Sequence, residues 1–130
     1  MTIQNLDSAC AKLGAKLASS GNKDTENGVT KALGVLEEQG VYALFLYLHA
    51  REKQWGQTTS NELSTFLRQN PSTQNALLGP NPNNSDLFGA LQQLACDLDK
   101  LLFARDLLHR ALVYARYHAK AAQGGGAKTP

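Results

Sequence analysis

The side chains best suited to catalysis or metal binding are sparse in this 130-residue chain. His49, His109 and His118 are its three imidazoles. A zinc site on a helix needs two histidines one turn apart and a third ligand nearby, and no pair has that spacing. His109 and His118 lie nine residues apart, about half a rotation out of phase on one helix. We therefore expect no metal site and no cofactor.

The carboxylates and glycines also lack a catalytic pattern. The neighbouring acids Glu37-Glu38 and Asp97/Asp99 point in diverging directions on a helix, which does not support paired-carboxylate chemistry. The chain contains no nucleophile elbow, no Walker-type phosphate loop and no strand-to-helix Gly-x-Gly-x-x-Gly. We expect a protein that is not an enzyme and takes no small-molecule substrate. An all-α active site assembled from distant residues is the alternative.

A group of basic residues near the C-terminus stands out. At 100° per residue, four side chains fall within roughly 60° of one another and form a stripe on one helix: Arg105, His109, Arg116 and Lys120. Arg110, Tyr114 and Tyr117 occupy other exposed-looking directions. Cations that track phosphates, with tyrosines on which bases stack, suit a single-stranded nucleic acid. The alternative is that basic residues gather at a helix C-terminus to complement its dipole and aid solubility.

Hydrophobic spacing places this stripe in an all-α protein. Apolar residues recur at three- and four-residue steps from 3 to 18, which predicts a first helix. Asp24 or Thr25 is expected to cap a second helix, which ends before Gly40. Residues 41–48 are apolar on all sides and are predicted to lie at the centre of the core.

The middle of the chain contains several turn signals. Gly56 is expected to end the third helix, and residues 59–62 fit a capping box that begins a fourth. A short helix over 74–78 is possible, and the dense Gly, Pro and Asn content of 79–84 predicts a loop.

The periodic run that begins at Ser85 or Asp86 satisfies either one long helix or two. We favour two, with a break between Asp97 and Lys100, because helices far beyond 25 residues are unusual in compact domains. Residues 123–130 have little to bury and are expected to form a disordered tail. The sequence thus predicts a single helical domain over 1–122, a compact bundle of about five to six helices.

Charge and cysteine content bound the cellular setting. The formal net charge is only +2, but from Lys100 to the end a lone acid, Asp106, stands among six Lys and Arg residues, so the C-terminal quarter is basic. Cys10 and Cys96 are too few for a disulfide framework, so both are read as small buried thiols in a reducing, cytoplasmic compartment. The longest apolar stretch, 41–48, is well short of a membrane span, and the N-terminus lacks a secretory signal pattern.

Two stretches resemble a known family. Residues 33–48 form a helix, a polar corner ending in Gly40, and then a very apolar helix. This pattern resembles the central hairpin of the small helical subunits of type III CRISPR effector complexes, the Cmr type in particular. Residues 105–121 look like that family's last helix, in which a leucine-aromatic pair is followed by basic residues and small alanines.

The resemblance implies a non-catalytic subunit, present in several copies that stack head to tail beside the complex's backbone. Its expected partners are other effector subunits, copies of itself, the guide RNA and the single-stranded target RNA, with no membrane contact. The residues expected to contact RNA are Arg105, His109, Arg110, Arg116 and Lys120. The alternative function is a helical protein interaction adaptor that meets an acidic partner and has no nucleic-acid role.

Overall fold

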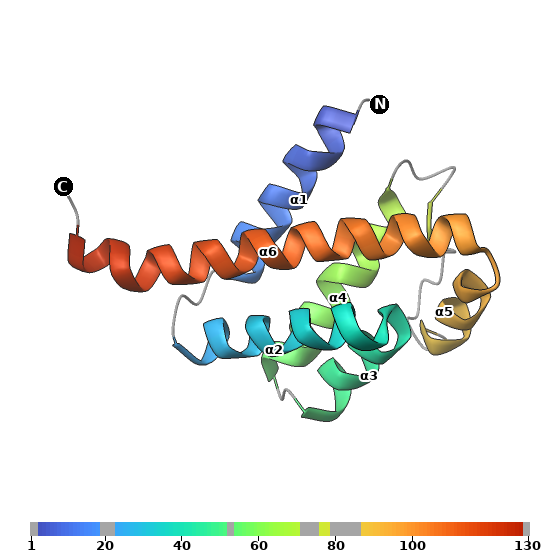
Figure 1. The fold of residues 1–130 in the computed structure, drawn as a ribbon, viewed down its shortest axis with the longest axis horizontal. Helices are drawn as coiled ribbons and strands as arrows, with labels where there is room; N and C mark the ends of the chain where they lie inside the picture. The colour runs from blue at the N-terminus through green and yellow to red at the C-terminus, as the bar shows by residue number, and fades with distance from the viewer. Residues whose placement is uncertain (1–2, 19–22, 52–53, 71–75, 79–86, 129–130) are drawn as a thin grey trace.

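The described elements of the protein are six α-helices, and no strand occurs among them (Figure 1). The computed structural model describes residues 3–18, 23–51, 54–70, 76–78 and 87–128. The helices are α1 (Ile3–Leu17), α2 (Lys23–Gln39), α3 (Val41–Arg51), α4 (Gln54–Gln69), α5 (Leu87–Ala95) and α6 (Leu98–Lys128). The predicted all-α bundle of five to six helices is confirmed.

The long helix α6 is the element around which the others pack. Figure 1 shows it running across the whole molecule, with α2 beside it and α1 crossing it. Its buried side chains recur at three- and four-residue steps and are small or branched, so neighbours approach closely: Ala104, Leu107, Leu108, Ala111, Leu112, Ala115 and Ala119. This stripe joins the core formed with the other helices.

Helices α1 and α6 approach each other closely at Gly14. A Cβ atom at this position would lie 2.5 Å from the Cβ of Tyr114 and 2.9 Å from the carbonyl oxygen of Ala111. Carbon atoms in contact normally stay about 3.5–4.0 Å apart, so only glycine fits here without moving a helix. The approach lets α1 bury Leu6, Cys10, Leu13 and Leu17.

Gly40 forms the corner between α2 and α3. Its φ of +101° lies in the left-handed region that favours glycine, and its N–H donates to the Leu36 carbonyl over 3.0 Å. Its own carbonyl accepts from the Leu44 N–H, also at 3.0 Å, which starts α3. The break predicted at Gly40 is confirmed. Residues 41–48 contribute to the core as predicted, with Leu44, Phe45 and Leu48 fully buried, but the segment is not buried on all sides, because Leu46 is 47% exposed.

The start of α4 differs from the prediction. The helix begins at Gln54, so Gly56 and the expected cap at Thr59 lie inside it. The Trp55 indole N–H donates to the Leu17 carbonyl over 3.4 Å, which fastens the first turn of α4 to the end of α1. Tertiary packing therefore overrides the local capping signal. Thr59 is buried, and its hydroxyl has no hydrogen-bond partner in the described part of the chain.

The C-terminal run consists of two helices, as favoured from the sequence. The break falls at Cys96 and Asp97, where an Asp97 carboxylate oxygen accepts from the Lys100 N–H over 3.2 Å. Cys96 lies in this turn and is exposed, so the prediction that its thiol is buried is wrong.

Two further expectations concern the C-terminal segment and the residues that follow α4. The structure continues α6 to Lys128, so helical hydrogen bonding extends through residues 123–128, which were expected to be a disordered tail. Residues 76–78 are not helical, while 74–75 and 79–84 fall outside the described residues.

In the parts of the chain that are described, no helix is both long and apolar enough to cross a bilayer.

Substitution of two helical glycines tests the crossing of α1 and α6. Gly14→Ala should lower the free energy of unfolding by about 2 kcal/mol, because the new methyl group overlaps the backbone of α6. Gly34→Ala is the matched control: apart from its chain neighbours and the backbone of its own helix, no atom lies within 4 Å of the added Cβ, so better helix propensity should raise stability by up to about 1 kcal/mol. Urea denaturation measures both. Equal effects of the two substitutions would contradict the close approach.

Candidate nucleic-acid interface

All five side chains predicted to contact RNA project from α6, so one continuous helix sets their spacing. The structure divides them by their neighbours. Two contact the end of α2, one contacts α1, and two lie nearer the C-terminus on an open part of the helix. The five therefore do not form one uniform surface.

Arg105 and His109 contact the C-terminal end of α2. The Arg105 guanidinium donates to the Glu37 carbonyl oxygen over 3.0 Å, and His109 Nε2 lies 2.7 Å from a Glu37 carboxylate oxygen. The last carbonyls of a helix lack intrahelical partners and carry its negative dipole end, so a cation there is favourable. These two side chains join α2 to α6 at the exposed edge of their apolar contact.

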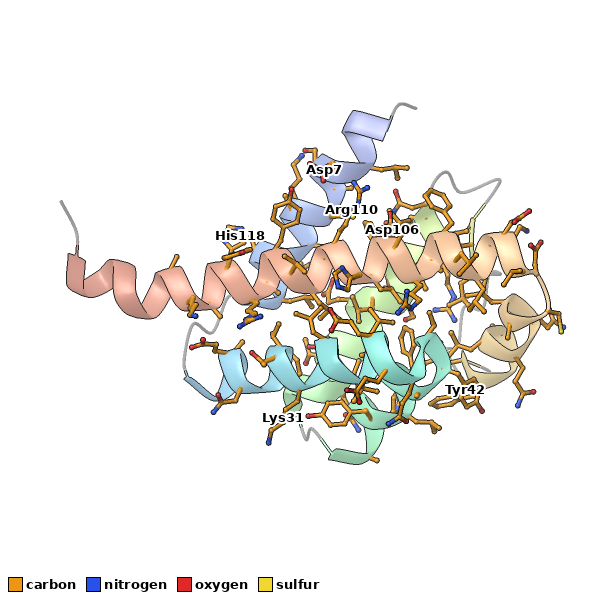
Figure 2. The ribbon with its side chains drawn as sticks, viewed as in Figure 1. Asp7, Lys31, Tyr42, Asp106, Arg110 and His118 are labelled. Carbon is orange, nitrogen blue, oxygen red and sulfur yellow. The ribbon has the colours of Figure 1, made fainter. Side chains whose placement is uncertain are left out.

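Arg110 is held between two carboxylates. Its Nη1 lies 3.4 Å from Asp7 on α1, and its Nε lies 3.3 Å from Asp106 one turn earlier on α6. Figure 2 shows Asp7, Arg110 and Asp106 on the same side of α6, where α1 passes. The Tyr114 hydroxyl donates to both Asp7 oxygens, at 3.1 and 3.2 Å. Arg110 and Tyr114 thus fasten α1 to α6.

The Asp7 carboxylate changes the acidity of Tyr114. The hydrogen bond that the Tyr114 hydroxyl donates to Asp7 stabilises the neutral phenol, and the negative charge of Asp7 repels a phenolate. Both effects raise the pKa of Tyr114 above its usual value. Cys10 lies on the same helix as Asp7, and burial raises the pKa of its thiol to about 11. At neutral pH this thiol is protonated, which makes it a poor nucleophile.

Arg116 and Lys120 have a different environment. Both are exposed, and neither has an ion-pair or hydrogen-bond partner among the residues that the structure describes. Together with Val113 and Tyr117 they line a hollow of about 300 Å³ on the solvent side of α6. Tyr117 is 67% exposed, so its ring is available to a ligand. This arrangement offers two cations and an aromatic ring.

Sequence reasoning placed the basic residues on one helix but missed their partners. Glu37 is 72 residues from His109, and Asp7 is 103 residues from Arg110. No local spacing reveals contacts at such separations. Reasoning from the helical angle also left Tyr117 outside the stripe, although it and Val113 line the same hollow as Arg116 and Lys120.

Other site chemistry has little support in the structure. Across the described ranges, no three His, Cys, Asp or Glu side chains are close enough to hold a metal ion. What the α6 face offers is positive charge for an anion and a flat apolar ring beside it.

The pKa of Tyr114 provides a test of the clamp between α1 and α6. Because the folded-state pKa exceeds the unfolded value of about 10, the interaction stabilises the protein below pH 10 and is lost as pH rises through the folded pKa. In a titration followed at 295 nm, the difference between wild type and Tyr114→Phe should report this raised pKa. Asp7→Asn should move it down toward 10. An unchanged titration in Asp7→Asn would show that the carboxylate does not act on Tyr114.

Comparison with known proteins adds no relative from which a function could be transferred. No family model matches the chain, and neither a curated protein nor a solved structure matches it significantly.

Proposed function

We propose that this chain is a non-catalytic, RNA-contacting small subunit of a type III CRISPR effector complex in the cytoplasm. In this function, the solvent side of α6 lies against single-stranded guide or target RNA and binds it through phosphates, without regard to sequence. Cleavage of the target belongs to partner subunits. Several copies stack along the complex.

The observation that carries the RNA contact is the pair of free cations on α6. Arg116 and Lys120 are exposed and uncommitted within the described structure, and they stand beside an exposed Tyr117. A cation already paired with a carboxylate must give up that partner before it binds a phosphate, whereas these two need not. Phosphate binding by free Lys and Arg releases counterions, which drives sequence-independent affinity.

The assignment to a CRISPR complex rests on the resemblance of residues 33–48 and 105–121 to its small subunits. In the structure these residues form the α2–α3 corner and the middle of α6. Arg105 and His109 join the two stretches through Glu37. The segments that carry the resemblance are therefore in direct contact, which is consistent with one shared helical unit.

Exposed leucines favour contact with another protein as well. Leu98 is 64% exposed and Leu102 is 53% exposed, one turn apart on the first part of α6. In the proposed complex they supply a subunit contact away from the hollow. They are also the observation that favours the second candidate, an interaction adaptor that binds a protein and no RNA. Affinity for RNA separates the two.

The salt dependence of RNA binding tests the proposal. Fluorescence anisotropy with a labelled single-stranded RNA should show binding that is similar for oligouridine and for a mixed sequence. If Arg116 and Lys120 contact two phosphates, affinity should fall about sevenfold between 50 and 200 mM salt. Absence of RNA binding at 50 mM salt would reject the RNA-contacting function and leave the adaptor. A duplex RNA of equal length serves as the comparison ligand.

A further inference from the structure

The hollow on α6 has two chemically distinct parts. Arg116 and Lys120 are four residues apart, so their Cβ atoms lie about 5–6 Å from each other on the helix surface. The Tyr117 ring and the Val113 side chain form the apolar part of the same hollow. A ligand that combines negative charge with a flat apolar group would complement both parts.

We propose that this hollow binds one nucleotide of a single-stranded nucleic acid, with its base stacked on Tyr117 and its phosphate held between Arg116 and Lys120. This inference rests on the proposed function and narrows it to a single site. Two cations one helical turn apart can share one phosphate or contact two successive ones. The volume of about 300 Å³ is at the lower end of the range for ligand pockets, which fits one nucleotide unit.

The other cations on α6 act differently in this scheme. Arg105 and His109 are engaged with Glu37, and Arg110 is engaged with Asp7 and Asp106. Arg116 lies seven residues beyond His109, or about 10 Å further along the helix. The five side chains predicted to contact RNA thus divide into three that contact other helices and two that bind the ligand.

The exposed aromatic ring favours a nucleotide over an acidic peptide. Carboxylates of a peptide would satisfy Arg116 and Lys120 but would leave the ring of Tyr117 without a stacking partner. Every base has a flat face, and stacking on an aromatic side chain is tolerant of sequence. A duplex hides these faces between its base pairs, so the strand must be single.

Substitutions in the hollow test the assignment by anisotropy with single-stranded RNA in 0.1 M salt. Tyr117→Leu should weaken binding about 5- to 150-fold and leave the salt dependence unchanged, because it removes stacking but no charge. Tyr117→Phe, which keeps an aromatic ring, should lose less. The double variant Arg116→Ala/Lys120→Ala should weaken binding about 5-fold and lower the slope of log affinity against log salt by about 0.7 if the two cations share one phosphate, and about 25-fold and 1.4 if they contact two successive ones.

A charge-matched control separates the hollow from general attraction. Lys12 on α1 and Lys31 on α2 are exposed, and Figure 2 shows Lys31 on the side of α2 away from α6. Lys12→Ala/Lys31→Ala removes the same charge as the double variant on α6 and should bind RNA nearly as wild type does. Equal losses in the two double variants would overturn the inference. Circular dichroism and thermal unfolding confirm that each variant is folded.

Further ligands show which class of molecule the hollow binds. The same experiments also separate failure of the hollow as a binding site from failure of the RNA-contacting function. A single-stranded DNA of the same sequence shows whether the ribose matters, and polyglutamate tests an acidic peptide. Competition by polyglutamate equal to that by RNA, with no effect of Tyr117→Leu, would replace the nucleotide by a peptide. If the wild-type protein binds RNA and all hollow variants bind it equally well, the hollow is not the binding site, but the RNA-contacting function stands. Wild type that binds no RNA rejects both.

Discussion

The backbones of α1 and α6 meet at Gly14, where a Cβ would come within 2.5–2.9 Å of atoms of Ala111, Tyr114 and Ala115. The rest of the arrangement depends on this approach. It brings Asp7, two turns earlier on α1, within hydrogen-bond reach of Tyr114 and beside Arg110. It also lets Cys10 pack against α6, with its Sγ 3.6 Å from the Leu107 carbonyl oxygen. A larger residue at position 14 would separate these groups by moving the whole helix.

The same packing decides which basic residues are available for a ligand. Helices α1 and α2 lie against α6 and present Asp7 and Glu37 to its middle turns. The cations there serve the fold, although surface ion pairs of this kind contribute little individually, about 0–1 kcal/mol. Arg116 and Lys120 lie further along α6 than these contacts. The cations of α6 therefore fall into two groups: those in the middle of the helix contact α1 or α2, whereas Arg116 and Lys120 are exposed without a partner in the described structure.

Features that depend on neighbouring residues in the sequence were predicted better than contacts between residues far apart in the chain. The α2–α3 corner depends on one residue, Gly40, whose conformation is a local property, and it was predicted correctly. The capping box at Thr59 is also a local pattern, but α4 begins before it, at Gln54. There the Trp55 indole makes a hydrogen bond to the end of α1 that no local pattern shows. The pairing of Arg110 with Asp7 could not be foreseen, because periodicity shows which face of a helix a residue occupies and not which helix lies opposite. The hollow at Tyr117 is likewise a property of the assembled surface.

The central claim is that the C-terminal part of α6 contacts RNA within a multi-subunit complex. The most direct test is purification of the tagged protein from its native cells, ultraviolet crosslinking, and mass spectrometry of the crosslinked residues together with sequencing of the bound RNA. The account predicts co-purifying CRISPR effector subunits, repeat-derived guide RNA, and crosslinks at Tyr117 or its immediate neighbours. Recovery of an unrelated protein partner without RNA, or crosslinks confined to helices other than α6, would contradict it.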